Sequence, residues 1–174
     1  MNNNKLEKGK YKAISVAKYL FSLDPKREYF TNRRIKNKIT FRTTTLGRFR
    51  LHQVLYLLQI LHYLKYNKPL LTDKFYAWEN GVIVYNVYTH FWELYHGLNG
   101  KDIKEIDDKE TKEFIDRCFN YLKTISEREL QEFSYNDPAW SSTWTRSEQP
   151  EIHFINNLAA YQSYCSHWLQ EIRL

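Results

Sequence analysis

The stretch from Leu46 to Tyr66 constrains the fold more than any other part of the sequence. Its apolar side chains recur around most of the circumference of an α-helix and not along a single stripe. The apolar positions are Phe49, Leu51, Val54, Leu55, Leu57, Leu58, Ile60, Leu61 and Leu64. A helix with this pattern needs contacts on several sides. We therefore predict that residues 46–66 form the buried central helix of the fold.

A membrane-spanning helix is a poorer interpretation of the same stretch. The apolar region is shorter than the roughly 20 residues that cross a bilayer. It is interrupted by His52, Gln53, Gln59 and His62. Residues 1–12 contain four lysines and no apolar run, so they lack the hydrophobic region of a signal peptide. The two cysteines, Cys118 and Cys165, show neither a disulfide framework nor zinc spacing. We expect a cytoplasmic protein that does not contact a membrane.

Helical spacing of apolar residues also predicts the surrounding elements. One helix is expected over 12–23, ending at Asp24-Pro25 because the residue before proline avoids the α region. Further helices are expected over 84–96, over 101–125, and from a capping box that opens at Ser126. A final helix is expected to start near Asn156, with an asparagine cap.

The remaining segments have weaker signals. Residues 26–45 suit either a short edge strand or an ordered loop, and we leave them unassigned. Residues 75–78 are typical of an extended segment, 79–81 of a tight turn, and 137–149 of a loop. Residues 152–155 are an alternative short strand. The predicted fold is mainly α: a single compact helical domain at 12–174, with at most a small β-hairpin or short strands, after a disordered segment at 1–11.

Positive charge is concentrated in the first third of the chain. Residues 1–50 carry 14 Lys and Arg against three Asp and Glu, whereas residues 51–174 carry 12 against 17. The close group comprises Arg33, Arg34, Lys36, Lys38, Arg42, Arg48 and Arg50. Such a segment suits a solvated surface, an acidic protein partner or nucleic acid, and the sequence leaves all three open.

Large aromatic side chains are unusually dense after residue 75. They are Tyr76, Trp78, Tyr85, Tyr88, Phe91, Trp92 and Tyr95. On a helix, Tyr88, Trp92 and Tyr95 would share one face. This stripe predicts either a core contact or an exposed anchor for a partner.

Residue patterns associated with catalysis are missing from the sequence. It has no glycine-rich phosphate loop, HExxH motif or nucleophile elbow, and no two of its six histidines are spaced i, i+4. We interpret His52 and His62 as packing residues. A hydrolase using His52, His62 or His153 with a carboxylate remains a minor alternative. The expectation is a protein that is not an enzyme, with no cofactor, metal or small-molecule substrate.

Four segments resemble the Panacea domain of SocA-type antitoxins and phage-associated proteins. In that family a helix reading roughly KLQKLLYF precedes G-K-P-L and then AW-x-x-GPVVPEVY. Here the corresponding segments are RLHQVLYL at 50–57, NKPL at 67–70 and AWENGVIVYNVY at 77–88, with a later partial match at 134–140. The sequence departs from the pattern at Val82 and Tyr85, which replace prolines, and at Tyr135, which replaces a histidine.

This resemblance implies a helical domain that binds and neutralises a toxic partner protein encoded nearby. It also implies that the family positions chiefly build the core; these are Leu51, Leu55, Tyr56, Ala77, Trp78, Gly81, Val87, Tyr88, Pro138 and Trp140. The candidate partner-binding residues are Tyr85, Tyr88, Trp92, Tyr95, Arg33, Arg34, Arg48 and Arg50. The alternative function is nucleic-acid binding through the basic N-terminal third.

Overall fold

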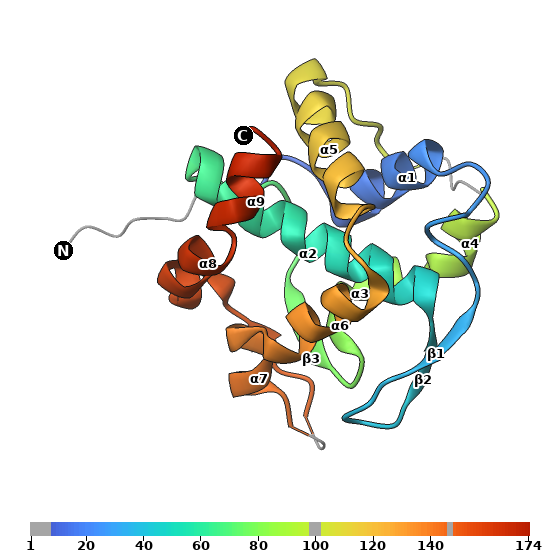
Figure 1. The fold of residues 1–174 in the computed structure, drawn as a ribbon. Helices are drawn as coiled ribbons and strands as arrows, with labels where there is room; N and C mark the ends of the chain where they lie inside the picture. Colours follow the sequence, from blue (N-terminus) through green and yellow to red (C-terminus); the bar gives the residue numbers. More distant parts are fainter. Residues whose placement is uncertain (1–7, 98–101, 146–147) are drawn as a thin grey trace.

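The computed structural model describes residues 8–97, 102–145 and 148–174, and its fold is mainly α, as predicted. The helix α2 (Leu46–Tyr66) runs through the middle of the molecule (Figure 1). It contacts α1 (Ala13–Leu23), α5 (Lys109–Leu122) and α8 (Leu158–Tyr164). The prediction of a buried central helix over 46–66 is confirmed.

Both ends of α2 are fixed by local hydrogen bonds. The side chain of Thr45 accepts from the backbone N–H of Arg48 at 3.3 Å and so caps the first turn. Asn67 ends the helix in the left-handed conformation, with φ of 55°, which asparagine tolerates better than most residues. Every residue from Leu51 to Leu61 is buried. Gln59, one of the polar interruptions, is used internally: its side-chain oxygen accepts from the backbone of Leu70 and Leu71.

None of the helices in the described residues is long and apolar enough to cross a membrane.

Short antiparallel strands form two small sheets. The unassigned segment 26–45 contains a hairpin of β1 (Arg34–Lys36) and β2 (Thr43–Thr45), which leads directly into α2. The second sheet has the order β4–β3–β5 and comprises β3 (Phe75–Trp78), β4 (Gly81–Ile83) and β5 (Glu151–Ile152). The expected extended segment at 75–78 and turn at 79–81 are therefore confirmed, and the strand at 151–152 overlaps the alternative considered for 152–155.

The single helix expected over 84–96 is wrong. The segment forms α3 (Tyr85–Thr89) and α4 (Phe91–Tyr95), separated by His90, which has φ of −101° and ψ of 14°. The Thr89 hydroxyl donates to the carbonyls of Tyr85 and Asn86, and His90 Nδ1 lies 2.8 Å from the Asn86 carbonyl oxygen. These side chains compete with the backbone for the carbonyls of the preceding turn, which explains the break.

The loop expected over 137–149 is also wrong at its start. Residues Pro138–Thr143 form α7, which follows α6 (Glu127–Asn136). The side chain of Asp137 caps α7 by accepting from the backbone N–H of Trp140 at 2.7 Å, and Pro138 occupies the first helical position, where its missing N–H costs nothing. The Ser126 cap predicted for α6 is confirmed by its bond to the Glu129 N–H. Residues 146–147 of the expected loop lie outside the described residues.

The C-terminal segment is not one asparagine-capped helix. A 3-10 helix η1 (Phe154–Asn157) precedes α8, and α9 (Ser166–Glu171) follows a break at Cys165, with no side-chain cap on either α-helix. The break allows Tyr161 on α8 to reach Asp137 while Trp168 on α9 packs against Phe133 at 5.2 Å between ring centroids.

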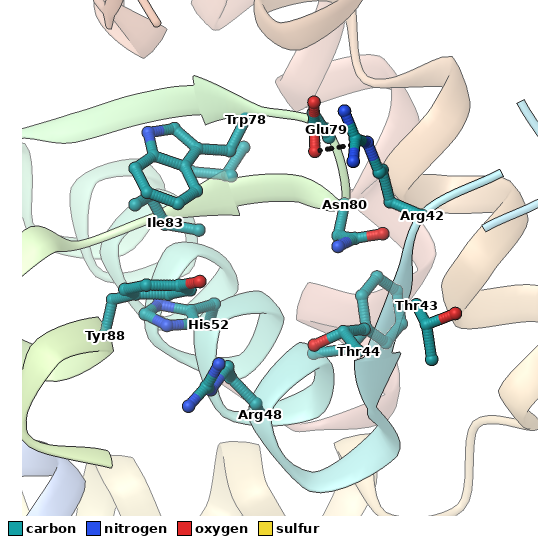
Figure 2. A pocket seen from close by; sticks show the side chains of 12 residues that line it. Arg42, Thr43, Thr44, Arg48, His52, Trp78, Glu79, Asn80, Ile83 and Tyr88 are labelled. Atoms are coloured by element: carbon teal, nitrogen blue, oxygen red, sulfur yellow. Dashed lines mark ion pairs between the residues drawn. The ribbon is translucent and has the colours of Figure 1, made fainter. Parts of the chain in front are cut away.

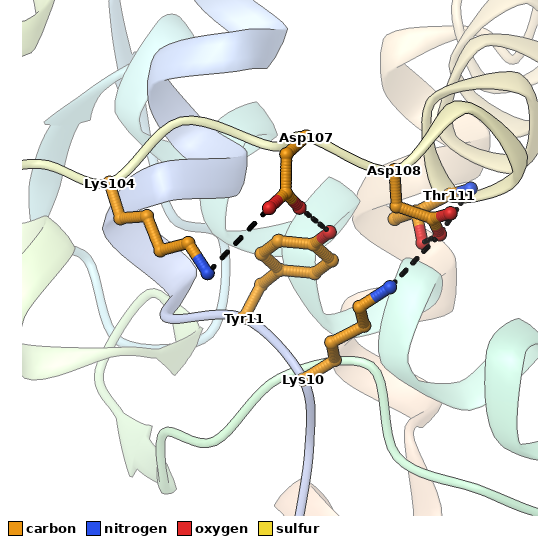
Figure 3. A network of polar contacts seen from close by, with 6 residues as sticks. All are labelled: Lys10, Tyr11, Lys104, Asp107, Asp108 and Thr111. Atoms are coloured by element: carbon orange, nitrogen blue, oxygen red, sulfur yellow. Dashed lines mark hydrogen bonds and ion pairs between the residues drawn. The ribbon is translucent and has the colours of Figure 1, made fainter.

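The N-terminal segment is held in place from Lys10 onward. The backbone N–H groups of Lys10 and Tyr11 donate to the carbonyl of Leu70, so the disorder expected over 1–11 is wrong for these two residues. Figure 3 shows the polar contacts of the Lys10 and Tyr11 side chains with the segment that leads into α5. The Tyr11 hydroxyl donates to Asp107 at 2.7 Å, and the Lys10 ammonium lies 3.3 Å from Asp108, the N-cap of α5. Residues 1–7 of the expected disordered segment lie outside the described residues.

The buried carboxylate of Asp137 connects three elements. The Tyr161 hydroxyl donates to it at 2.7 Å, the Tyr56 hydroxyl lies 3.4 Å from it, and the two hydroxyls are 2.6 Å apart. Burial raises the pKa of the Asp137 carboxyl, although its hydrogen bonds act in the opposite direction. Helices α2, α7 and α8 thus meet at one buried polar group.

Removing the Tyr161 hydroxyl should destabilise the protein. We expect Tyr161→Phe to lower the free energy of unfolding by about 1–3 kcal/mol, because a buried carboxylate oxygen loses its donor. The control is Tyr164→Phe, which changes an exposed tyrosine on the same helix. Urea unfolding of both variants measures the difference, and equal stability of the two would contradict the role assigned to Asp137.

Candidate functional site

A polar cavity of about 250 Å³ lies between the start of α2, strand β2, the β3–β4 turn and helix α3. In Figure 2 the β3–β4 hairpin forms one wall, and the strand carrying Thr43 and Thr44 forms the opposite one. The ion pair between Arg42 and Glu79, 3.2 Å apart, connects these two walls. The cavity therefore joins the basic segment of the sequence to the aromatic segment.

His52 lies on α2 and lines the cavity. It is buried, and its Nδ1 accepts a hydrogen bond from the backbone N–H of Val84 at 3.2 Å. Burial, and then the nearby charge of Arg48, lowers the pKa of His52 to about 3. The ring is therefore neutral at physiological pH, and because Nδ1 is an acceptor its proton lies on Nε2.

Arg48 lies one turn earlier on α2 and is surrounded by aromatic rings. Its guanidinium carbon is 4.7 Å from the centroid of the Tyr88 ring, 5.1 Å from that of Phe91 and 5.8 Å from that of Trp92. These distances are those of cation–π contacts. Figure 2 shows Tyr88, His52 and Arg48 on the same side of the cavity, and the centroids of the Tyr88 and His52 rings are 6.1 Å apart.

These contacts extend into a continuous series of side chains, which we call the aromatic row. Successive members lie within about 6 Å of each other, from Tyr85 to Trp78 at 5.5 Å, Trp78 to Tyr88 at 4.7 Å, and Trp92 to Tyr95 at 5.4 Å. The aromatic row comprises Tyr85, Trp78, Tyr88, Arg48, Trp92 and Tyr95. Tyr85 and Trp92 are 43% and 44% exposed, so the row presents two large rings to solvent.

The β3–β4 turn is positioned by contacts from α6 and α7. The indole N–H of Trp140 donates to the carbonyl of Trp78 at 2.7 Å. Gly81 has φ of 107°, and a β-carbon at this position would come within 2.6 Å of the Ser134 hydroxyl oxygen. Only glycine suits this backbone conformation and close approach. Contacts at Trp78 and Gly81, which flank the turn, thus hold it at the cavity wall.

Some of the family positions are joined by hydrogen bonds. Tyr56 bonds to Tyr161 beside Asp137, and Trp140 bonds to Trp78, so segments distant in the sequence form one network. The buried family positions are Leu51, Leu55, Tyr56, Ala77, Gly81, Val87 and Trp140, while Trp78, Tyr88 and Pro138 are partly buried.

The three departures from the family pattern lie in different settings. Val82 is buried on β4 opposite Ala77, and Tyr135 is partly buried on α6. Tyr85 opens α3, and its hydroxyl donates to Gln149 at 3.0 Å. The replacement of a proline by Tyr85 therefore adds one of the two exposed rings of the aromatic row.

The basic candidates divide into separate places. Arg48 belongs to the aromatic row, whereas Arg50 turns inward, donates to the Tyr29 carbonyl at 2.9 Å and stacks on that tyrosine's ring. Arg33 forms an ion pair with Glu127 of α6, and Arg34 is exposed on β1. The structure brings together the four aromatic candidates and Arg48, but not the other three arginines.

Sequence reasoning did not assign several residues of this region to a site. His52 was interpreted as a packing residue and Trp78 as structural, while Thr44 and Asn80 were not singled out, yet all four line the cavity. Their common signal is position: Thr44 immediately precedes the cap of α2, and Asn80 occupies the two-residue turn. Thr44 and Asn80 line the same cavity only because segments far apart in the sequence come together in the fold.

The depressed pKa of His52 predicts acid sensitivity. Because the folded-state pKa lies below the usual value of 6.5, the neutral ring contributes stability above that pH, and this stability is lost as the pH falls from 6.5 toward 3. Between about pH 7 and about pH 5.5, the wild type should lose about 1 kcal/mol more unfolding free energy than His52→Gln. Urea unfolding at both pH values tests this, and parallel losses would contradict it. His62 is present in both proteins, so its contribution cancels.

The model of the antitoxin SocA-like Panacea domain family matches residues 51–141, just over half of the chain. The matched segment contains His52, the β3–β4 turn and α3, but the cavity wall from Arg42 to Phe49 precedes it. Neither a curated protein nor a solved structure matches the chain. The family assignment thus rests on a segment that includes most of α2 and the whole β3–β4 hairpin, and by it the chain belongs to the SocA-like antitoxin family with a Panacea domain.

Proposed function

We propose that this chain is an antitoxin-like binding module that neutralises a toxic partner protein by direct contact. Membership of the SocA-like antitoxin family supports an antitoxin role in general. The observation that carries the contact mechanism is the aromatic row, which leaves Tyr85 and Trp92 more than two-fifths exposed. Rigid aromatic side chains of this kind are frequent energetic hot spots of protein interfaces.

The proposed module acts without turnover. His52 is the histidine of the cavity, and with a pKa of about 3 it is a poor proton carrier at neutral pH. His62 binds the Lys68 carbonyl with its Nδ1, 2.7 Å away, and packs on Phe114. His153 lies 3.9 Å from Glu151 with most of its side chain exposed. These environments favour structural roles over the minor hydrolase alternative.

We propose that the partner is the product of a neighbouring gene, as the family resemblance implies. Its binding should depend on the exposed members of the aromatic row, Tyr85 and Trp92. We expect Tyr85→Ala and Trp92→Ala each to weaken the complex about tenfold or more, because truncating a central aromatic anchor typically costs about 2 kcal/mol. Isothermal titration calorimetry with the purified partner measures the change.

The matched control is Tyr164→Ala, since Tyr164 is 45% exposed but lies on α8, where its ring packs against Phe133 and Trp168 and not against a member of the aromatic row. If the control weakens the complex as much as Trp92→Ala does, the aromatic row is not the binding surface.

The β1–β2 hairpin favours nucleic-acid binding as a second candidate. Its exposed cations are Arg33, Arg34, Lys36, Lys38 and Arg42, two of which are already paired with Glu127 and Glu79. Phe41 near the hairpin tip is 66% exposed and has φ of 60°, an uncommon conformation for an aromatic residue. Cations beside an exposed ring are also the features that bind single-stranded nucleic acid.

Binding by the hairpin predicts a strong dependence on salt. Fluorescence anisotropy with a labelled single-stranded oligonucleotide should show affinity that falls steeply with added salt, and Lys36→Ala should reduce the slope of log K against log salt by roughly 0.7. Absence of binding at low salt would eliminate this candidate and leave the protein-binding proposal untouched.

A further inference from the structure

Unpaired polar atoms are concentrated around the cavity at the start of α2. In the part of the chain that the structure describes, eight buried side-chain nitrogen or oxygen atoms have no hydrogen-bond partner. Four of them belong to cavity residues: Arg48 Nε, His52 Nε2, Trp78 Nε1 and Asn80 Oδ1. Most buried polar side-chain atoms in proteins have a partner. Half of the unpaired atoms in the described residues thus belong to residues that line one cavity.

Hydrogen-bond donors outnumber acceptors among these atoms. Arg48 Nε and Trp78 Nε1 can only donate. The His52 Nε2 carries the ring proton because Nδ1 accepts from the Val84 backbone, so it also donates. An occupant that satisfies this lining must therefore present hydrogen-bond acceptors.

The charge balance selects a single negative charge. Arg42 is paired with Glu79 at 3.2 Å, and His52 is neutral. Within the described residues Arg48 has no carboxylate within ion-pair distance, and its close neighbours are the rings of Tyr88 and Phe91. One unpaired positive charge matches a carboxylate better than a phosphate group, which carries up to two negative charges near neutral pH.

Size favours a side chain over a larger ligand. The volume of about 250 Å³ is below the roughly 300–1,000 Å³ of pockets that enclose drug-sized molecules. The cavity also lies beside the exposed rings of the aromatic row, through contacts of Trp78 and Arg48 with Tyr85 and Trp92. A protein bound to the row would place its own side chains at the cavity mouth.

We propose that the cavity receives the carboxylate of an aspartate or glutamate side chain of the partner protein, with Arg48 as its ion-pair partner. The inference rests on the proposed protein-binding function and adds the chemistry of one contact. Arg48 precedes the segment matched by the family model, which begins at residue 51. The charged group that selects the partner is thus supplied from outside the matched segment.

A nuclear magnetic resonance titration tests the cavity without the partner. The probe is the α-amide of N-acetylglutamate, which carries one side-chain carboxylate, and the control probe is the corresponding glutamine amide. We expect saturable shifts of the Trp78 indole N–H and the Arg48 Nε–H with the glutamate probe, with affinity in the millimolar range, and at least about tenfold weaker binding of the neutral probe.

Three arginine variants complete the titration. Arg48→Gln should abolish the response, Arg48→Lys should retain a weaker one, and Arg117→Gln, which removes the same charge from an exposed position on α5, should leave it unchanged. Equal responses to both probes, an unchanged response in Arg48→Gln, or tighter binding of inorganic phosphate than of the glutamate probe would overturn the proposal. If Arg48→Gln fails to fold, Arg48→Lys and the pair of probes still decide the matter.

The partner complex separates this inference from the proposed function. Weakening by Trp92→Ala but not by Arg48→Gln, together with no response to the glutamate probe, would overturn the carboxylate contact and leave the protein-binding function standing. Failure to form any partner complex would overturn the proposed function, whereas the probe titration would still report on the cavity itself.

Discussion

The carboxylate of Asp137 accepts hydrogen bonds from elements that are far apart in the sequence. It caps α7 through the Trp140 N–H and accepts from Tyr161 on α8, whose hydroxyl lies 2.6 Å from that of Tyr56 on α2. The cap fixes the start of α7. Helix α7 carries Trp140, whose indole N–H donates to the carbonyl of Trp78 at the β3–β4 turn. Because the turn forms one wall of the cavity, the shape of the site depends on a buried polar group outside it.

The aromatic row and the cavity combine features that a fold core would normally hide. In the proposed complex, the exposed tyrosine and tryptophan rings would supply large contact area, and the charge of Arg48 would supply selectivity, since a partner without a carboxylate would leave that charge unmatched. Two of the five exposed cations of the hairpin are already paired, because Arg33 and Arg42 form ion pairs with Glu127 and Glu79. The strongly basic appearance of the first 50 residues therefore overstates the free positive charge of the folded surface.

Much of the fold follows from local signals in the sequence. The circumferential apolar pattern predicted α2, the Ser126 pattern predicted the start of α6, and the Asn80-Gly81 pair predicted the β3–β4 turn. Local patterns failed where side chains act on distant backbone or change the helix direction, as at His90, Asp137 and Cys165. The site was only partly predictable for the same reason. Helical spacing identified the aromatic residues. The cavity, however, forms where β2, α2 and the β3–β4 turn come together, and the periodicity of the sequence does not encode contacts between these segments.

Growth of a bacterial host is a direct test of neutralisation by contact. The neighbouring open reading frame would be expressed from an unrelated promoter, so that this chain cannot act by repressing its transcription. We expect toxicity that is relieved by co-expressing the wild-type chain, with the two proteins recovered as a complex. In the Tyr85→Ala, Trp92→Ala double variant at equal expression, we expect the relief to be lost. A harmless neighbour, or relief that persists in the double variant without a complex, would contradict neutralisation by direct contact through the aromatic row.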